Sequence, residues 1–279
     1  MKTLTFIKDI LPKPAAQKIL DAKTTLNHYC QVNYTTPAER LKYILHPRFE
    51  PTTITLPDSN EPQAIISAVV FQEKNFHFPR MPFAGNYTFS QTNYRCYCID
   101  KETGLRTVWF FGTTLDHWSI FVPRDVWRFP WHRARINFAT DLKQNEQTKH
   151  YHQYKMTAKS DWGQAEINVK DLQRKGEDSD FPGFPNKETA LIYLTHPMSG
   201  HFYLNTYKPR LGCWEIWHEP MNPNIGVYDE TQDNYFMMYE NLGLITRDQK
   251  PYNILIQPEI DYNIYLPPLE SISKNSRYS

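Results

Sequence analysis

The chain has few of the residues that mark disulfide-rich, metal-binding, membrane-spanning or nucleic-acid-binding proteins. It has only four cysteines in 279 residues and no Cys-x-x-Cys pair, which argues against a disulfide scaffold or a cysteine-bound zinc site. No run approaches the roughly 18 apolar residues that a membrane helix needs. Lysine and arginine total 31 against 30 acidic residues. Without a net charge of either sign to attract them, we predict neither nucleic acid nor a membrane as a partner.

Sequence motifs for nucleotide and hydrolase chemistry are also missing. We find no phosphate-binding loop, dinucleotide fingerprint or nucleophile elbow, which argues against nucleotide-dependent enzymes and serine hydrolases. His150 and His152 are two residues apart, so a strand would place both on one face, but no third ligand follows nearby. We therefore predict no metal and no cofactor. Residues 1–11 lack the apolar core of a signal peptide, so we expect a cytoplasmic protein.

Aromatic residues are plentiful. They make up 15% of the chain, with 18 tyrosines and 16 phenylalanines, alongside 21 prolines and 10 glycines. This composition is typical of many strands joined by proline-containing loops. We predict a mainly β fold, α+β by content, with a hairpin that turns at Gly104. The predicted strands are residues 64–71, 94–99, 105–111, 149–156, 162–169, 201–207, 213–218, 253–256 and 260–266.

The N-terminal part of the chain predicts helices. Residues 14–31 have apolar side chains at a loosely helical spacing. Thr36 as N-cap, Pro37 at the first helical position and Glu39 three residues after the cap then form a capping box. We therefore divide the chain into a helical N-terminal arm with linker, a β domain and a C-terminal tail, at residues 1–62, 63–268 and 269–279.

The densest group of functional side chains is at residues 123–136, which hold three aromatics, four arginines and one histidine around Pro130. A proline between Phe129 and Trp131 favours a rigid loop or bulge beside a sheet. Such a loop can direct side chains into a cavity. His132 is a candidate general acid or base, because an imidazole titrates near neutral pH. The alternative is a structural histidine bonded to the backbone.

The order Arg124-Asp125-Val126-Trp127 and then Phe129-Pro130 resembles the arginine–acid–hydrophobe and Phe-Pro motifs of the acetoacetate decarboxylase-like superfamily. In the decarboxylase itself two lysines follow the Phe-Pro pair, and the first forms a Schiff base with the substrate. Here Trp131 and His132 hold those positions. The catalytic lysine pair is therefore lacking.

Residues 89–97 resemble the Asn-hydrophobe-Arg strand of an uncharacterised bacterial branch of that superfamily, a domain of unknown function. In that branch an aromatic residue commonly follows the proline and an alanine comes three residues later, as Trp131 and Ala134 do. Gln91 stands where relatives often carry a glutamate. The resemblance spans roughly residues 64–268. It implies a cone or barrel of mostly antiparallel strands.

The resemblance also implies an apolar, aromatic cavity for a small organic acid or carbonyl compound. In a strand, Arg95 shares a face with Asn93 and Tyr97. If that face is the interior, the guanidinium is a carboxylate-binding group, because an isolated buried charge is costly. The alternative is an arginine on a solvated hairpin face. We predict His132 as the catalytic residue, and as ligand-binding residues Arg95, Gln91, Trp131, Phe129 and Trp109.

The reaction is not determined by these residues. Without a lysine after Pro130 we do not expect a Schiff-base decarboxylase, unless a lysine such as Lys155 arrives from another strand. Glu215 and His218 are a second acid–base candidate, but a regular strand puts them on opposite faces and a bulge would be needed. The open alternatives are a lyase, isomerase or hydrolase that uses His132, a non-catalytic ligand binder, and a protein-interaction module. A homo-oligomer also stays open.

Overall fold

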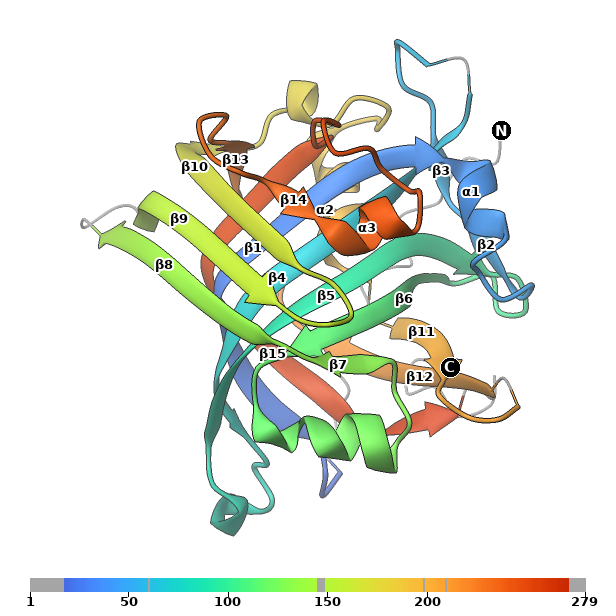
Figure 1. The fold of residues 1–279 in the computed structure, drawn as a ribbon, viewed down its shortest axis with the longest axis vertical. Coiled ribbons are helices and arrows are strands. Elements are labelled where there is room, and N and C mark those ends of the chain that lie inside the picture. Colours follow the sequence, from blue (N-terminus) through green and yellow to red (C-terminus); the bar gives the residue numbers. More distant parts are fainter. Residues whose placement is uncertain (1–17, 60, 145–148, 198, 209, 271–279) are drawn as a thin grey trace.

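The strands of this protein form one mixed sheet. The computed structural model describes residues 18–59, 61–144, 149–197, 199–208 and 210–270. Within them, the 15-stranded sheet has the order β1-β4-β5-β6-β11-β12-β15-β13-β10-β9-β8, with β2, β3, β7 and β14 pairing at its sides (Figure 1). Two described pairings, β6 with β7 and β6 with β11, are parallel, and the others are antiparallel. The prediction of a mainly β fold is confirmed.

The first half of the chain contributes β1 (Ala22–Pro37), α1 (Ala38–Lys42), β2 (Phe49–Pro51), β3 (Thr53–Ile54), β4 (Gln63–His77), β5 (Tyr87–Asp100), β6 (Arg106–Leu115), β7 (Trp131–Arg133) and β8 (Arg135–Gln144). The second half contributes β9 (Lys149–Lys159), β10 (Ala165–Lys175), α2 (Lys187–Thr195), β11 (Ser199–Leu204), β12 (Arg210–Trp217), β13 (Asn224–Tyr228), β14 (Tyr235–Phe236), α3 (Met237–Asn241) and β15 (Asn253–Glu270).

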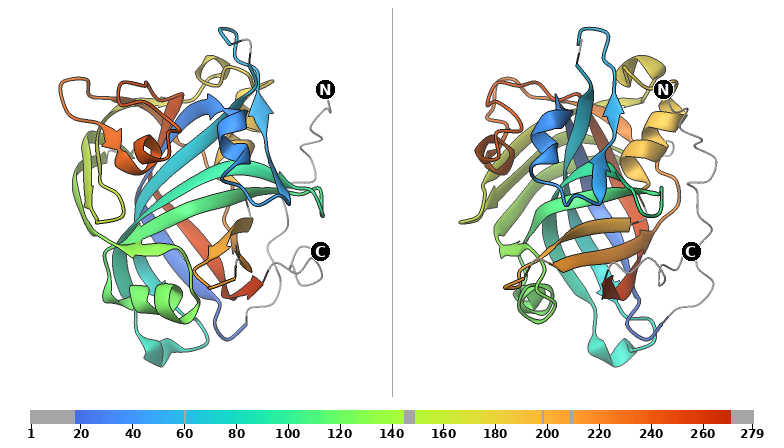
Figure 2. Two further views of the ribbon diagram at one scale, coloured as in Figure 1. Left: turned by 45° about the vertical axis from the view of Figure 1, so that its right-hand side comes forward. Right: turned by 90° about the vertical axis from the view of Figure 1, so that its right-hand side faces the viewer.

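Seven of the strands close into a ring. β1 pairs with β4 on one side and with β15 on the other, and the path β4-β5-β6-β11-β12-β15 joins these two neighbours. We call these seven strands the strand ring. From β15 the sheet continues through β13 into β10, β9 and β8, which form an outer layer across β1, β4 and β5 (Figure 2). A large apolar cluster between ring and outer layer includes Val32, Ile66, Tyr94, Tyr154 and Ile167.

The predicted helical N-terminal arm is wrong. Residues 14–17 lie outside the described part of the chain, but from Ala22 onward the segment forms β1. A bulge explains the misleading pattern. His28 has a positive φ of 53°, and the register of β1 against β4 shifts at this point. The bulge puts Leu26 and Tyr29 on the same inward face although they are three residues apart, which is the spacing of a helix.

The second predicted helix is present only as the five residues of α1. Pro37 is its N-cap, and no side chain makes a capping hydrogen bond, so the predicted capping box does not form. Thr36 instead belongs to the end of β1 and pairs with Ala64 of β4. None of the helices in the described residues is long and apolar enough to cross a membrane.

Most of the predicted strands are confirmed. The hairpin is β5 and β6, and the apolar run that follows Gln63 is β4. The two strands expected near the C-terminal end are one continuous strand, β15. β15 runs to residue 270, and residues 271–279 of the predicted tail lie outside the described part of the chain. α2 begins after Asn186, whose side chain accepts a hydrogen bond from Thr189 N at 2.9 Å.

The stretch around Pro130 has a definite structure. Residues Val122–Val126 form a short π-helix, closed by a bond from Trp127 N to Val122 O at 3.0 Å. Arg128 then takes a positive φ of 64° and redirects the chain. After Pro130 the chain becomes β7, which pairs in parallel with the end of β6. Residues 131–133 are therefore held beside the sheet by backbone hydrogen bonds.

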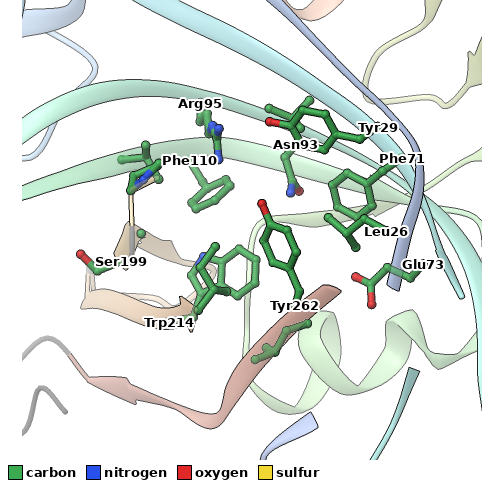
Figure 3. Close-up of a pocket in the computed structure, with 16 residues that line it drawn as sticks. Leu26, Tyr29, Phe71, Glu73, Asn93, Arg95, Phe110, Ser199, Trp214 and Tyr262 are labelled. Carbon is green, nitrogen blue, oxygen red and sulfur yellow. The ribbon is translucent and has the colours of Figure 1, made fainter. Parts of the chain in front are cut away.

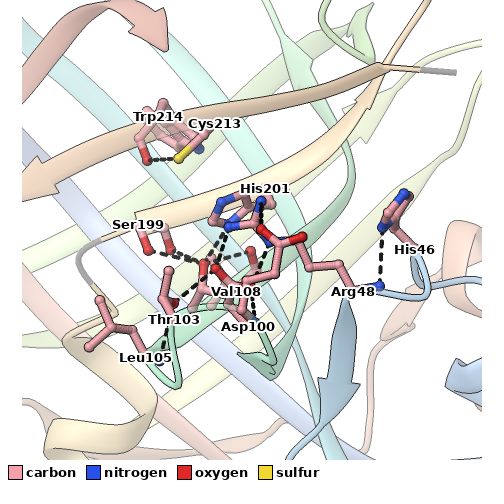
Figure 4. Close-up of polar contacts among 12 residues, drawn as sticks. His46, Arg48, Asp100, Thr103, Leu105, Val108, Ser199, His201, Cys213 and Trp214 are labelled. Atoms are coloured by element: carbon pink, nitrogen blue, oxygen red, sulfur yellow. Dashed lines mark hydrogen bonds and ion pairs between the residues drawn. The ribbon is translucent and has the colours of Figure 1, made fainter. Parts of the chain in front are cut away.

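A buried ion pair fixes the turn end of the β5–β6 hairpin (Figure 4). The Arg48 and Asp100 side chains are only 8% and 4% exposed, and Arg48 binds Asp100 through two nitrogens, with Nε 2.6 Å from Oδ1. Asp100 also accepts a bond from Thr103 Oγ1 at 2.9 Å. Next to this pair, Thr107 Oγ1 is 2.9 Å from His201 Nδ1 and ties β6 to β11. These side-chain bonds reinforce a parallel pairing that has only two register pairs.

Candidate functional site

A cavity lies inside the strand ring, on the face that points away from the outer layer (Figure 3). Its volume is about 40 Å³. One water molecule needs roughly 10–15 Å³ on this scale, so the space is narrow. Its polar lining includes Arg95, Asn93 and Glu73, together with Ser199 and the tyrosines Tyr29 and Tyr262. Most of the wall is apolar and aromatic, including Leu26, Phe71, Phe110, Trp214, Ile216 and Tyr262.

Arg95 brings a permanent positive charge into this cavity. The residue is 7% exposed, and its Nη2 donates to the Leu194 carbonyl at 3.2 Å and to Gln31 Oε1 at 3.3 Å. Its Nε is buried without a hydrogen-bond partner. In the described residues no carboxylate pairs with this guanidinium. A buried charge surrounded by neutral acceptors is poorly compensated, which makes Arg95 suited to an anionic ligand.

A network of neutral groups orients Arg95. The Gln31 amide donates from Nε2 to Tyr97 OH at 3.0 Å and to the Leu194 carbonyl at 3.2 Å, while its Oε1 accepts from Tyr29 OH. Arg95 also lies over the Tyr97 ring, with Cζ 5.7 Å from the ring centre. Burial raises the pKa of Tyr29 well above its usual value. Tyr29 therefore stays uncharged at neutral pH, and the hydrogen bonds of the network position the guanidinium without neutralising it.

Asn93 presents a second hydrogen-bond donor. Its Oδ1 accepts from Gln91 Nε2 at 2.8 Å and from Thr113 Oγ1 at 2.7 Å. Because both bonds use the oxygen, the Nδ2 of Asn93 is free of partners in the described chain. Figure 3 shows the amide between Arg95 and Glu73. Gln91 therefore acts on the cavity indirectly, by fixing the orientation of Asn93.

Glu73 provides a carboxyl group at the other end of the cavity. It is 4% exposed, and its Oε2 has no hydrogen-bond partner. Burial raises the pKa of the Glu73 carboxyl to about 8. At neutral pH most molecules therefore hold Glu73 as the neutral acid, with a minor fraction as carboxylate.

His218 supports the cavity wall from behind. Its ring is fully buried and stacks on Tyr262, with ring centres 4.3 Å apart. Nδ1 is 2.7 Å from the Glu219 carbonyl oxygen and Nε2 is 3.0 Å from the Thr195 carbonyl oxygen. Burial lowers the pKa of His218 to about 4. Neither His218 nor its proposed partner Glu215 lines the cavity, whereas the two neighbours of Glu215 in β12 do.

The structure places His132 outside the cavity. Its ring stacks on Trp162 at 4.2 Å with an angle of 4° between the planes. Trp162 in turn lies against Gly112, where an added Cβ would come within 2.5 Å of the indole. Burial, and secondarily Arg124, lowers the pKa of His132 to about 4. His132 is thus an uncharged ring in an aromatic stack at neutral pH.

We expect the variant His132→Phe to keep this stack and to leave ligand binding unchanged. Phenylalanine preserves a flat ring against Trp162, so the free energy of unfolding should change by less than about 1 kcal/mol, whereas His132→Ala should lose roughly 1 kcal/mol of stacking. Denaturant unfolding and a thermal-shift titration with a carboxylate would measure both effects. Loss of carboxylate binding in His132→Phe alone would contradict the placement of His132 outside the site.

The other predicted site residues are divided between different surroundings. Trp109 faces the opposite side of β6, where it packs against Phe49 and Tyr203. Phe129 and Trp131 pack with Phe202 in a cluster beside the cavity but do not line it. Of the predicted residues, the structure thus brings Arg95 into the cavity, with Gln91 next to it. Whether any of them binds a ligand stays a prediction.

Lys155 forms an ion pair with Glu166 at 2.7 Å and does not line the cavity.

Sequence reasoning missed Glu73 and gave Asn93 no role of its own. A usable signal was present, because residues two apart share one face of a strand. Applied to the apolar run of β4, this period places Val69, Phe71 and Glu73 on one face, and all three line the cavity. A carboxyl group on the same strand face as buried apolar residues was therefore the pattern that could have predicted Glu73 as a cavity residue.

Known structures share this fold. The enduracididine biosynthesis enzyme MppR complexed with pyruvate is 12% identical, with 92% of this chain and 93% of that chain covered and a TM-score of 0.57. An acetoacetate decarboxylase-like enzyme from Sphingomonas wittichii RW1 is 10% identical, with coverage of 94% and 98% and a TM-score of 0.56. The acetoacetate decarboxylase from Legionella pneumophila is 14% identical, with coverage of 98% and 97% and a TM-score of 0.52. The fold is therefore acetoacetate decarboxylase-like.

No curated protein matches the sequence. The family is nevertheless shown by residues 23–251, which match the model of the family DUF2071, described as "Uncharacterized conserved protein". The chain belongs to the DUF2071 family. The predicted resemblance to an uncharacterised family with acetoacetate decarboxylase-like structure is confirmed at the level of family and fold.

Proposed function

We propose that this protein binds a small organic anion, a carboxylic or keto acid, in the cavity of the strand ring. The observation that carries the proposal is the Arg95 guanidinium, which is buried, lines the cavity and has an Nε without a partner. A carboxylate at this point would gain charge-assisted hydrogen bonds and would neutralise the buried charge. Arg95 thus supplies an anchor for the acid group.

The surrounding groups favour a ligand with a carbonyl oxygen and a narrow carbon skeleton. The Nδ2 of Asn93 offers a donor for the oxygen, and the aromatic walls suit the carbon atoms. A protein with this fold, MppR, has been solved with pyruvate, which is a keto acid. A keto acid combines the two groups that Arg95 and Asn93 would bind.

A Schiff base is not part of this proposal. Among the described residues that line the cavity there is no lysine. Trp131 and His132 follow Pro130 in place of a lysine pair, and Lys155 is engaged by Glu166. Binding itself needs only the aromatic cavity and the Arg95 anchor, so it does not depend on any covalent step.

The proposal predicts that carboxylates stabilise the wild-type protein against heat and stabilise Arg95→Met far less. Pyruvate and 4-oxopentanoate would be titrated in a thermal-shift experiment, with their uncharged methyl esters as matched ligands. We expect at least about a tenfold loss of carboxylate affinity in Arg95→Met, the free energy of one charge-assisted hydrogen bond. Arg95→Met without ligand should be no less stable than wild type, because it removes a poorly compensated buried charge.

The control variant is Arg40→Met, which makes the same change at an exposed position of α1. It should bind carboxylates like the wild type. Equal stabilisation of wild type and Arg95→Met by carboxylates would contradict the anchor role of Arg95. No stabilisation of the wild type by any carboxylate would overturn the proposed function itself.

A further inference from the structure

We propose that Glu73 is the acid–base catalyst of this cavity. Its substrate would be a keto acid that Arg95 holds by the carboxylate and from which Glu73 removes a proton at the carbon beyond the carbonyl. The inference rests on the proposed function, since it requires the acid group to bind at Arg95. It adds a reaction class, keto–enol proton transfer, and a constraint on the length of the substrate.

The order of the three polar groups along the cavity carries the inference. Arg95 of β5 is opposite Ser67 of β4, Asn93 is opposite Val69, and Glu73 lies six residues beyond Ser67. The side chains of all three residues line one cavity, so they converge on a shared space from these positions. Anchor, hydrogen-bond donor and carboxyl group therefore follow one another along the cavity, as Figure 3 shows.

The environment of Glu73 suits proton transfer better than a structural role. A structural carboxyl in a protein interior normally has partners for both oxygens. The Glu73 carboxyl has a hydrogen bond with the Thr24 side chain, but its Oε2 has no partner and lies in a wall shared with Leu26 and Phe71. Burial raises the pKa of the carboxyl to about 8. A general base is most effective when its pKa is near the working pH.

The proposed step transfers one proton and needs no oxidant or reductant. The Glu73 carboxylate takes a proton from the carbon next to the ligand carbonyl. The C–H electron pair forms a carbon–carbon double bond, and the carbonyl π electrons move to the oxygen to give an enolate. The Nδ2–H of Asn93 donates to this oxygen, a contact that strengthens as charge develops. The proton on the Glu73 carboxyl exchanges with solvent, and Glu73 then returns a solvent-derived proton to the carbon as the enolate reverts to the ketone.

The spacing limits the substrate. In pyruvate the methyl carbon is attached directly to the carbonyl that carries the carboxylate, so it stays close to Arg95. In 4-oxopentanoate two methylene groups separate the carboxylate from the carbonyl, and the methyl group lies beyond the carbonyl. Because Glu73 lies beyond Asn93 on the side away from Arg95, the carbon on the far side of the carbonyl is the one that faces it, which favours the longer acid.

The test is deuterium exchange of 4-oxopentanoate in D₂O, followed by proton NMR. We expect the wild-type protein to accelerate exchange of the terminal methyl group more than exchange of the methylene on the other side of the carbonyl. Glu73→Gln should lower the catalysed rate at least about a hundredfold, the usual contribution of a general base. It should retain carboxylate binding in the thermal-shift assay. Glu50→Gln, at an exposed position of β2, is the matched control and should exchange like wild type.

The pH dependence distinguishes Glu73 from the other titratable groups of the region. The wild-type exchange rate should rise between pH 6 and 8, as Glu73 becomes a carboxylate. Burial raises the pKa of both Tyr29 and Tyr262 on the cavity wall, and Arg95 stays charged. His117, which stacks on Phe89 opposite Glu73, has a pKa lowered by burial. None of these groups accounts for a rise near pH 8.

The outcomes separate this inference from the binding proposal. Exchange that survives Glu73→Gln, or Arg95-dependent binding without any exchange, would overturn the role of Glu73 and leave the binding function standing. Faster exchange of pyruvate than of the terminal methyl of 4-oxopentanoate would overturn the length constraint. If no carboxylate binds to the wild type, both proposals fail together.

Discussion

At pH 8.5 we expect the free energy of unfolding of Glu73→Gln to exceed that of the wild type by roughly 3–5 kcal/mol, because each pKa unit corresponds to about 1.4 kcal/mol. Burial raises the pKa of Glu73 in the folded protein from 4.5 to about 8. At a pH between these two pKa values, the Glu73 carboxyl has released its proton in the unfolded chain and retains it in the folded protein. Wild-type stability therefore falls as pH rises through this window, whereas glutamine stays neutral throughout.

Denaturant unfolding at pH 4, 6.5 and 8.5 would measure this effect. Near pH 4 the carboxyl is protonated in both states, so Glu73→Gln should differ little from wild type. The exposed Glu50→Gln change should give the same small difference at every pH. A constant advantage of Glu73→Gln across the three pH values would show that packing, and not the buried carboxyl, causes it.

The second large effect on stability is expected when one partner of the Arg48–Asp100 ion pair is removed. Asp100→Ala leaves the Arg48 guanidinium buried, next to the exposed side chain of Glu102. We expect a loss of roughly 3–5 kcal/mol in the free energy of unfolding, since a buried charge without its partner is costly. Equilibrium denaturation would measure it.

A double-mutant cycle provides the control for this prediction. Arg48→Met combined with Asp100→Leu removes both charges and leaves no buried ion behind. The double variant should be markedly more stable than the sum of the two single changes implies. Strictly additive effects would mean that the two side chains do not stabilise each other.

The parts of the fold that could be predicted are those in which local pattern and tertiary environment agree. The β5–β6 hairpin has β-forming residues on both sides of a glycine turn, and it forms as predicted. β1 could not be predicted by the same reasoning. Its inner face carries polar groups such as Gln31 and Asn33, and the bulge at His28 changes its phase. Both features depend on contacts with strands that are far away in the sequence, so the local pattern of β1 does not reveal them.

The site shows the same division. Arg95 was identified because a charged residue in an apolar strand needs an explanation, and it lies in the cavity. His132 was attractive because of its position after Phe129-Pro130, but position along the chain does not decide which side of β7 a ring faces. Trp162, which holds it, lies 30 residues later in the sequence. Glu73 was overlooked because it follows the apolar run instead of interrupting it.

The pairing of β1 with β15 has a consequence for the speed of folding. Ala22 lies opposite Ile264, so the last contact of the strand ring joins residues that are more than 200 positions apart. Closing so long a loop early is entropically unfavourable, and proteins dominated by distant contacts fold slowly. Until β15 has been synthesised and docked, one edge of β1 lacks its partner strand. During that interval the growing chain exposes a long unpaired edge, which is the kind of surface that chaperones protect from aggregation.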